Sequence, residues 1–435
     1  RGANDKPVRF NLADEILEAI EGEQHLSRFV HLCSKTLTSE VSIVLSSAEG
    51  KDRYKVFIVD DTEVTRPRQF SVFIVPIGRD GDWLFATEKG RRSLRVQCKK
   101  DRLAIVTLFR DNHYESLQVI KDELAQFVLR LNPVKGVRGT DDRVEFLSMG
   151  EHDVKKTIAS GESKLNGRWS VEDVVIRDRE YRRLVFLSSQ NLVQSEAAFK
   201  EGKKGKRIIS FDELACEHHE VMLLSFALLK DSPLLKPDKV PFKVAVLGLG
   251  GGLLAAFLVR HMAQARVTGI ELDADVVDIA TKHFSFPYSD ARMNVRVMDA
   301  LHYLDETARP DAEKQDVIMV DLASSMSEEG LSCPPPVFLT PRALKAMADS
   351  LSEGGVLALN LVTRDEDVSK AAKAKVAEHF ETLAVVSSEE DVNEVLIATK
   401  NKLPAFDSRK FVKSLNREKP WIKAVADKID KLMLL

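Results

Sequence analysis

The stretch from residue 244 to 272 constrains the fold of this chain more than any other. An apolar run rich in β-branched residues breaks at Gly248, a helical pattern follows the glycines, and a second short apolar run ends at Glu271. Glycines in such a turn, here including Gly250 and Gly251, let a backbone approach a ligand where any Cβ would collide. A carboxylate at the end of the second strand can accept hydrogen bonds from both hydroxyls of a ribose. The stretch therefore predicts a nucleotide-type pocket.

The helix after this glycine turn restricts the kind of nucleotide. The dinucleotide fingerprint places a third glycine where this chain has Leu253, because the helix must lie close to a pyrophosphate. A cofactor with an adenosine end and no phosphates has no such requirement, and S-adenosylmethionine is the common one. The turn by itself is weak evidence, so NAD stays open as the alternative at this point.

Strand and helix patterns alternate from about residue 244 to 400, which predicts a mostly parallel, doubly wound sheet. Ligands of such sheets bind at the carboxyl ends of the strands. Residues 352–355 would form the turn into the fifth strand. We expect seven strands, at 243–248, 266–271, 293–298, 316–321, 355–362, 382–388 and 393–399. Their ends would line one crevice with Gly248, Glu271, Asp299, Asp321 and Asn360.

Three domains are expected along the chain. An α+β domain of unknown role is predicted at 1–145, with helices at 12–21 and 115–131 and strands at 41–46, 54–59, 71–76 and 103–109. A small β-hairpin module is predicted at 146–210, with a hairpin at 181–196 and a mobile basic linker at 200–207. An amphipathic helix at 211–229 would open the last domain, at 211–435. The fold class is therefore α/β: a Rossmann-like, seven-stranded domain preceded by a small β module and an N-terminal α+β domain.

Two carboxylates at strand ends are candidates for binding the adenosine. The register of Glu271 after the glycine turn favours ribose binding over a plain surface carboxylate, and Leu272 is grouped with it as a cofactor residue. Asp299 ends the third strand, where it can accept from the adenine amino group while the Ala300 amide donates to a ring nitrogen. The alternative for Asp299 is a helix cap.

Asp321 is the candidate catalytic residue, because it closes an apolar strand next to where the sulfonium methyl should point. An acid there can favour the positive charge of the cofactor, orient an incoming amine or take its proton. The alternative is a cap on the following loop. Asn360, at the end of the fifth strand, would either bind a substrate amide or satisfy local backbone groups.

Two further segments are candidates for contact with the substrate. Pro334 lies in a proline-stiffened loop at 332–336, which predicts either a rigid gate for the methyl acceptor or a plain helix start. His219 follows His218 at the head of the predicted helix. Adjacent histidines lack the i, i+4 spacing of a metal pair, so we interpret them as a feature of the helix start and expect no metal ion.

Composition and charge exclude several partners. The chain has 64 Lys and Arg against 67 Asp and Glu, so its net charge of -3 provides no basic field to bind nucleic acid. Its four cysteines form no Cys-x-x-Cys pair, which indicates neither a zinc site nor a disulfide framework and fits reduced thiols in the cytoplasm. The longest uncharged apolar run, between Lys243 and Arg260, is too short to span a membrane.

Several motifs together resemble the spermidine synthase superfamily over about residues 181–400. They are Leu192-Val193-Gln194, Asp212-Glu213, His219-Glu220, Gly248 to Gly252, Glu271, Asp299-Ala300 and Asp321. The resemblance implies a small β module, a Rossmann-like domain and an S-adenosylmethionine-type cofactor, with Gln194 among the cofactor-binding residues. Polyamine synthases of that family carry Asp-x-x-Asp, and the second position here is Ser324, which argues against aminopropyl transfer.

A longer resemblance, from about Phe70 to the end of the chain, is to the C-terminal half of the methyltransferase-like protein 13 family. Its segments include Cys-Glu-His-His, Gly-Leu-Gly-Gly-Gly and Ser-Cys-Pro-Pro-Pro. The resemblance implies methylation of the N-terminal α-amine of translation elongation factor 1-alpha. An upstream domain of that family methylates a lysine of the same factor. This chain shows one cofactor motif, so only the N-terminal activity carries over.

The favoured hypothesis is an S-adenosylmethionine-dependent protein N-terminal methyltransferase whose partner is the elongation factor. An α-amine has a pKa of about 7.7–8.0 against about 10.4 for lysine, so a strong base is not required. The alternatives are polyamine aminopropyl transfer and a catalytically inactive, cofactor-binding scaffold. Neither nucleic acid nor a membrane is expected as a partner, and a homodimer is left open.

Overall fold

The computed structural model divides the chain into two compact units, Arg1–Asp153 and Val154–Leu435. It describes residues 24–432 with gaps. The gaps are 25, 34–36, 48–49, 66–68, 77–79, 81–82, 110–111, 113, 115–116, 134–143, 148–155, 177–178, 187–192, 324–329, 364, 388–392 and 403–405. No helix in the described part of the chain combines the length and apolar character needed to cross a membrane.

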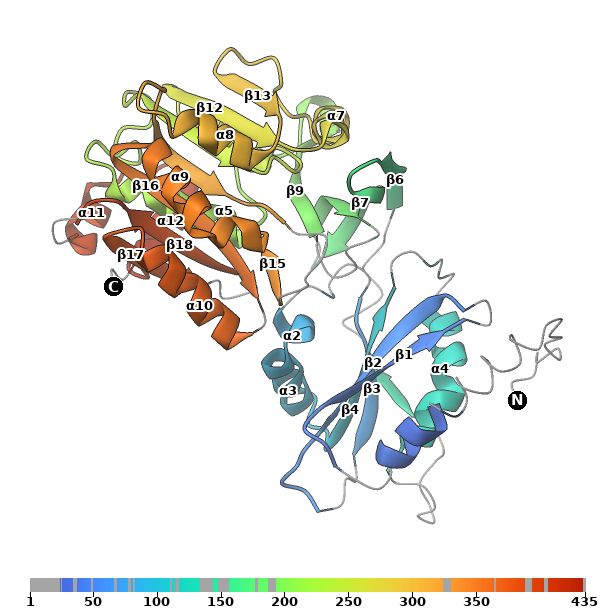
Figure 1. Cartoon of the computed structure of the whole chain (residues 1–435). Helices are drawn as coiled ribbons and strands as arrows, with labels where there is room; N and C mark the ends of the chain where they lie inside the picture. Colours follow the sequence, from blue (N-terminus) through green and yellow to red (C-terminus); the bar gives the residue numbers. More distant parts are fainter. Residues whose placement is uncertain are drawn as a thin grey trace. The chain divides into compact units, whose positions relative to one another are not determined.

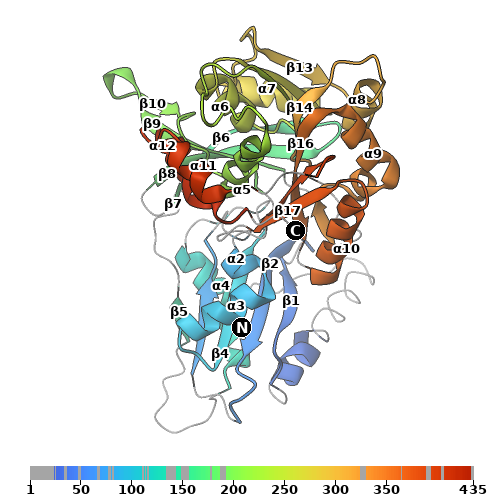
Figure 2. The ribbon, with the colours of Figure 1, turned by 90° about the vertical axis from the view of Figure 1, so that its left-hand side faces the viewer.

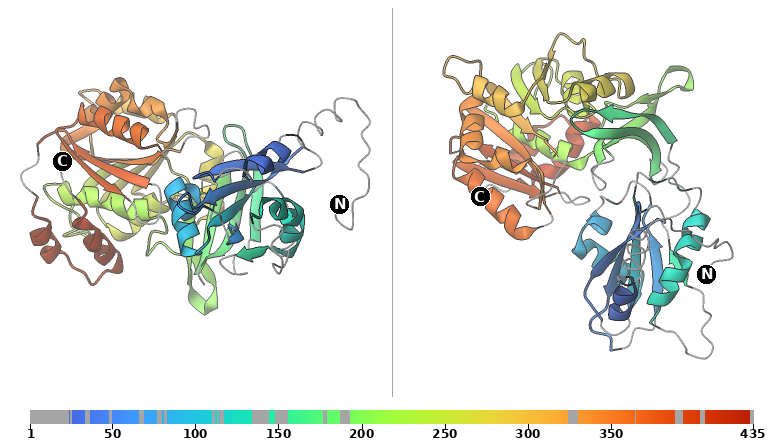
Figure 3. Two further views of the ribbon diagram at one scale, coloured as in Figure 1. Left: turned by 90° about the horizontal axis from the view of Figure 1, so that it is seen from below. Right: turned by 45° about the vertical axis from the view of Figure 1, so that its right-hand side comes forward.

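The N-terminal unit is an α+β layer structure. Its five-stranded sheet has the order β1-β2-β4-β3-β5, where β1 and β2 are antiparallel neighbours and β3 runs parallel to β4 and β5. α4 covers one face of this sheet and α2 with α3 covers the other (Figure 3). The strands are β1 Val41–Ser46, β2 Asp52–Asp60, β3 Phe70–Ile74, β4 Arg102–Leu108 and β5 Glu145–Leu147, and the helices are α2 Trp83–Ala86, α3 Glu88–Gln97 and α4 Leu117–Leu131.

The four strands and the second helix expected here are confirmed, whereas the helix predicted at 12–21 lies outside the described residues. The unit extends past the boundary drawn from the sequence at residue 145, because β5 pairs with β3. At the centre of the unit, Arg102 is fully buried and forms a two-pronged ion pair with Asp60. A buried pair of this kind needs every donor satisfied, and Arg102 also donates to the carbonyls of Cys33 and Leu131.

The second unit begins with an antiparallel five-stranded sheet of order β10-β9-β8-β7-β6. The strands are β6 Lys156–Ser163, β7 Gly167–Ile176, β8 Arg179–Phe186, β9 Val193–Glu201 and β10 Arg207–Ile209. The predicted hairpin corresponds to β8 and β9, and its expected turn lies outside the described residues. The predicted mobile linker is wrong: β9 and β10 form a tight hairpin around the short helix η1 Lys203–Gly205, which two residues with positive φ, Lys204 and Gly205, make sterically feasible.

An eight-stranded sheet forms the centre of this unit (Figure 1). Its main path is β13-β12-β11-β14-β16-β18-β17, parallel from β13 to β16, with β18 antiparallel to both neighbours. The strands are β11 Phe242–Leu247, β12 Ala265–Glu271, β13 Met293–Val297, β14 Gln315–Val320, β15 Leu331–Cys333, β16 Leu351–Thr363, β17 Thr382–Ser387 and β18 Asn393–Thr399. All seven expected strands are confirmed, and β15, which pairs with β16, is additional.

Helices cover both faces of this sheet, because its strands are apolar on both sides. Figure 2 shows α8, α9 and α10 on one side and α5, α6, α11 and α12 on the other. The small antiparallel sheet packs against α6 and α7. The helices are α5 Glu217–Met222, η2 Leu223–Leu228, α6 Leu253–His261, α7 Ala274–His283, α8 Ala300–Thr307, η3 Pro336–Leu339, α9 Pro341–Ser350, α10 Glu366–Ala377, α11 Ser408–Ser414 and α12 Pro420–Ile429.

Two local predictions in this unit are wrong. The helix expected at 211–229 begins only at Glu217, because the preceding residues make tertiary contacts instead: Asp212 pairs with Lys200 and Arg260, and Leu214 is buried in the core. The turn expected at 352–355 lies within β16, where a register shift against β14 accommodates the glycines.

Candidate active site

The glycine turn joins β11 to α6 by close backbone packing. Gly248, Gly250 and Gly252 all have positive φ. A Cβ at Gly248 would lie 2.2 Å from the carbonyl oxygen of Asp321, so only glycine fits between the ends of β11 and β14. A Cβ at Gly250 would lie 2.5 Å from the hydroxyl of Ser195. Protein atoms alone therefore exclude a Cβ at Gly248 and Gly250, and the approach of a ligand to this turn stays a prediction.

Ser195 connects the small sheet to this turn and was not singled out from the sequence. Its buried hydroxyl accepts a hydrogen bond from the Gly251 amide at 2.6 Å and donates to the carbonyl of Gln194 at 2.6 Å. Gln194, a predicted cofactor residue, is consequently held beside the glycine turn on β9. In the sequence, Ser195 directly follows Gln194, and only Gln194 was predicted to belong to the site.

Glu271 ends β12 with its carboxylate held by backbone amides. Leu249 donates to Oε2 at 3.1 Å and Asp273 donates to Oε1 at 3.0 Å. Burial raises the pKa of this carboxyl, against the opposing effect of the amide donors. The next residue, Leu272, leaves 57% of its surface exposed, which provides an apolar surface beside a fixed carboxylate.

Asp299 lies close to the same end of the sheet. The Met298 amide donates to the carbonyl of Glu271 at 2.9 Å, which continues the pairing of β13 with β12. Asp299 caps α8, because its Oδ1 accepts from the Leu301 amide at 2.8 Å, and Ala300 is the buried first residue of that helix. The helix-cap interpretation is therefore confirmed, and adenine binding by the same residue stays a prediction.

Asp321 is the centre of a hydrogen-bond network at the end of β14. Its amide donates to the carbonyl of Leu247 at 2.9 Å, which fixes the backbone beside β11. Its Oδ2 lies 2.9 Å from Nε2 of His219 and 3.4 Å from Nε2 of His218. Its Oδ1 accepts from the side-chain amide of Asn360 at 2.9 Å. Three residues singled out separately from the sequence thus meet at one point.

The electrostatics of this network keep Asp321 ionised. Burial opposes ionisation, but His218 and His219 outweigh it, and the pKa of Asp321 lies well below its usual range. Burial and the neighbouring His218 lower the pKa of His219 despite the nearby carboxylate. Because a carboxylate only accepts, Nε2 of His219 donates to Asp321. Burial and the charge of Asp321 raise the pKa of the Cys333 thiol well above its usual range, and that thiol stays protonated.

The proline segment is attached to the sheet. β15 pairs with β16 through Cys333 and Val362, and the buried Pro334 follows directly. Pro336 is the first residue of η3, so the helix-start interpretation is confirmed for that proline. Contact of Pro334 with a substrate stays a prediction, and Ser324 lies outside the described residues.

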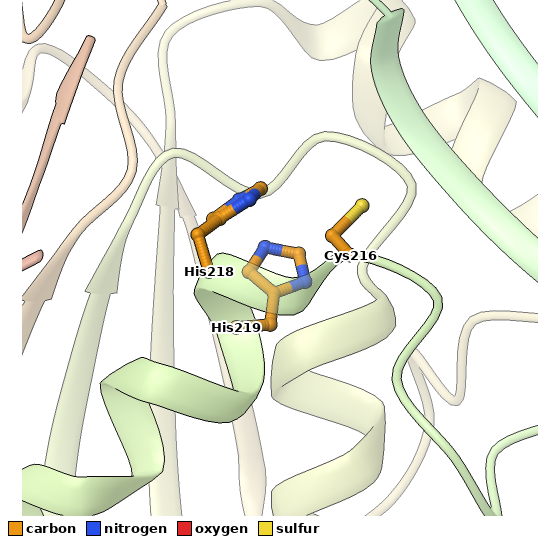
Figure 4. Close-up of side chains that lie close together, drawn as sticks. All are labelled: Cys216, His218 and His219. Carbon is orange, nitrogen blue, oxygen red and sulfur yellow. The ribbon is translucent and has the colours of Figure 1, made fainter. Parts of the chain in front are cut away.

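The convergence of Cys216 with His218 and His219 was not predicted from the sequence, which indicated only a helix start for the two histidines. The fold brings Cys216, His218 and His219 together at the start of α5, with their ligand atoms all within 4.8 Å of one another (Figure 4). Asp321, which contacts both histidines, is 102 residues from His219 in the chain, so no local spacing could have revealed the cluster.

Comparison with known proteins finds a family model that matches part of the chain, including Glu271 and Asp321. Residues 216–385 match the spermine/spermidine synthase domain. The chain is 35% identical over 440 residues to the eEF1A lysine and N-terminal methyltransferase of Xenopus laevis, covering 94% of this chain and 62% of that protein. The human protein of the same name is 35% identical over 427 residues, covering 90% of this chain and 60% of that protein. The chain thus spans about three-fifths of the length of these relatives. A crystal structure of human methyltransferase-like protein 13 in complex with SAH is 31% identical, with a TM-score of 0.44, and covers 50% of this chain and 95% of that one.

Proposed function

We propose that this chain, which is similar over 90–94% of its length to eEF1A lysine and N-terminal methyltransferases, transfers a methyl group from S-adenosylmethionine to the N-terminal α-amine of eEF1A in the cytoplasm. The observation that carries the proposal is the position of Asp321. Its carboxylate is fixed by His219 and Asn360 at the same edge of the sheet where Glu271 ends β12.

The residues at this edge fit an adenosine-containing cofactor. Glu271 is a carboxylate oriented by two amides, suited to accept from the ribose hydroxyls, and Leu272 offers an apolar surface to the adenine. Asp299 and the Ala300 amide would bind the edge of the base. The segment from Gly248 to Gly251 and Gln194 would bind the rest of the cofactor, which supplies the electrophilic methyl group when it is bound.

Asp321 would align the amine for in-line attack. An α-amine has a pKa of about 7.7–8.0, so a useful fraction is neutral at physiological pH and its lone pair can point at the methyl carbon. One N–H of this amine would donate to Asp321, whose orientation His219 and Asn360 restrict, and a fixed acceptor reduces the entropy lost on reaching the reactive geometry. The proton released on methylation would pass to Asp321 or to water.

Aminopropyl transfer to a polyamine is the second candidate, and the match of residues 216–385 to the spermine/spermidine synthase domain favours it. The replacement of the second acid of Asp-x-x-Asp by Ser324 opposes it, because a diamine needs a second carboxylate to bind its far ammonium group. An inactive scaffold is opposed by the full set of fixed carboxylates. Lysine methylation requires removal of a proton from a group with a pKa of about 10.4, and it is the less favoured activity.

The direct test is mass spectrometry of the N-terminal peptide of eEF1A after incubation with this chain and isotopically labelled S-adenosylmethionine. We expect labelled methyl on the α-amine. Label confined to lysine would replace the proposed activity with lysine methylation, and spermidine formed from putrescine and decarboxylated cofactor would favour the second candidate. If isothermal titration detected no binding of S-adenosylmethionine, the proposal would be rejected outright.

A further inference from the structure

Three side chains with metal-binding atoms converge at the start of α5, and a carboxylate from the end of β14 contacts two of them. Cys216, His218 and His219 have ligand atoms within 4.8 Å of one another (Figure 4). The imidazole nitrogens of both histidines face the same carboxylate oxygen, Oδ2 of Asp321, at 3.4 Å and 2.9 Å. A thiol, two imidazoles and a carboxylate are the donor types that Zn²⁺ takes in proteins.

The backbone explains how such closely spaced residues converge. Cys216 precedes α5 with an extended conformation, φ -93° and ψ 123°, whereas His218 and His219 lie in the first turn of the helix. Because the chain direction changes after Cys216, its side chain lies beside the histidines. The two imidazole rings have centroids 4.3 Å apart. The spacing of these residues along the sequence therefore gave no indication that their side chains lie close together.

We propose that Cys216, His218, His219 and Asp321 bind a divalent transition-metal ion of the zinc class. Bonds of about 2.0–2.3 Å in a tetrahedral complex hold neighbouring ligand atoms about 3.3–3.6 Å apart. The two separations between imidazole nitrogens and Asp321 lie close to that range. Those among Cys216, His218 and His219 are at most 4.8 Å, so side-chain rotations would have to shorten them on binding. Binding replaces the hydrogen bonds to Asp321 and releases the proton of the Cys216 thiol to solvent.

The surroundings of the cluster support this assignment. The side chains of His218, His219 and Asp321 are 14%, 12% and 23% exposed, so the donors are shielded and yet within reach of an entering ion. Asn360 donates to Oδ1 of Asp321, which orients the carboxylate with Oδ2 toward the imidazoles. Partners of this kind, which hold a ligand without touching the metal, are typical of metal sites.

The site has a regulatory consequence that rests on the proposed function. The oxygen of Asp321 that would ligate the ion is part of the carboxylate proposed to align the amine. A bound ion and the methyl acceptor would therefore exclude each other, and the ion would act as an inhibitor that competes with the peptide and not with the cofactor.

Cobalt absorption spectroscopy of the intact, chelator-treated chain tests the site directly. Co²⁺ reports its ligands, because a thiolate ligand gives a charge-transfer band in the near ultraviolet and tetrahedral geometry gives strong visible bands. We expect both in the wild type and in Cys98→Ser, a control that removes another half-buried cysteine, and we expect the thiolate band to disappear in Cys216→Ser. Zn²⁺ should displace Co²⁺ and abolish the spectrum.

Titration of Zn²⁺ into variants tests the remaining ligands. His219→Gln and Asp321→Asn should each weaken Zn²⁺ binding at least about 10- to 100-fold, the range for loss of a supporting partner of a metal site. The absence of a thiolate band in the wild type, or its persistence in Cys216→Ser, would overturn the proposal without reliance on any variant that misfolds. These spectra need neither methyl donor nor acceptor, so a failure of the proposed methyl transfer is distinguishable from a failure of the metal site.

Discussion

Asn360 and Asp321 are joined across neighbouring parallel strands: the side-chain amide of Asn360 donates to Oδ1 of Asp321 at 2.9 Å. The orientation of that amide is itself determined, because Asn393 on β18 donates to the side-chain oxygen of Asn360 at 3.0 Å. A carboxylate accepts only, so the nitrogen of Asn360 must face Asp321. The antiparallel strand β18 thereby fixes the direction of the proposed catalytic carboxylate without touching it.

Replacing Asn360 by Ala should slow methyl transfer about 10- to 100-fold, because a hydrogen bond to a charged group contributes about 1.5–3 kcal/mol. The affinity for S-adenosylmethionine should be unchanged, since Asn360 orients Asp321 and not the cofactor. Asn294→Ala, an exposed asparagine on β13, is the matched control. Single-turnover kinetics and isothermal titration separate the two effects, and a variant with normal kinetics would remove Asn360 from the site.

Asp321→Asn should lower the rate of transfer by about 10²- to 10⁴-fold, the usual contribution of a positioned acid or base. Asp316→Asn is the control, because Asp316 lies at the other end of β14 and accepts from the Lys243 amide and Ser352. That control should transfer methyl normally. Full activity of Asp321→Asn would refute the proposed alignment of the amine, although it would leave cofactor binding unaffected.

Glu271→Ala should weaken S-adenosylmethionine binding by about 2–3 kcal/mol, the scale of charged hydrogen bonds left unmade. Asp278→Ala, which removes an exposed carboxylate of α7 paired with Lys282, serves as the control in the same titration. If the dissociation constant changed by less than a factor of about three, against about 30-fold or more expected from that energy, Glu271 would not be the ribose ligand.

Gly248, in the glycine turn, and Gly354, in β16, separate two costs of replacing a glycine: backbone strain at positive φ, and a clash of the new Cβ with neighbouring atoms. Gly354→Ala should cost about 1–2 kcal/mol, because that glycine has a φ of +79° with open space around its Cβ position. Gly248→Ala should cost about 3 kcal/mol or more and abolish cofactor binding, because its Cβ would also meet the carbonyl of Asp321 at 2.2 Å. Urea denaturation measures both. Equal losses would show that the turn moves freely away from β14.

Selectivity can be tested with three peptides. A peptide that begins at the free α-amine of eEF1A should be methylated, whereas its N-acetylated form should not, because an amide nitrogen has no available lone pair. A form extended by a few residues places the amine at a different distance from its recognition sequence. Methylation of the acetylated peptide at a comparable rate, measured by mass spectrometry, would assign the activity to its lysines.

The sequence predicted the elements whose periodicity is local. All seven central strands were identified, because most of them are apolar runs buried on both faces, and Glu271 and Asp321 were found because strand ends converge in a parallel sheet. The helix at 211–229 was overextended, since tertiary contacts of Asp212 and Leu214 override their helical pattern. The contact of His218 and His219 with Asp321 depends on the whole fold, and no property of any of these residues alone indicates it.

The residues of the network at Asp321 are synthesised at widely separated times, because they lie far apart in the chain. His219 is made first, Asp321 follows 102 residues later, Asn360 a further 39 and Asn393 a further 33. Nearly the whole second unit must therefore be synthesised before Asn393 is present to orient Asn360 and, through it, the carboxylate of Asp321. A chain interrupted before β18 would contain Glu271, the glycine turn and Asp321, but would lack the Asn393 side chain that orients the amide of Asn360. The last residue that orients the Asp321 carboxylate is therefore synthesised after the strands that would hold the cofactor.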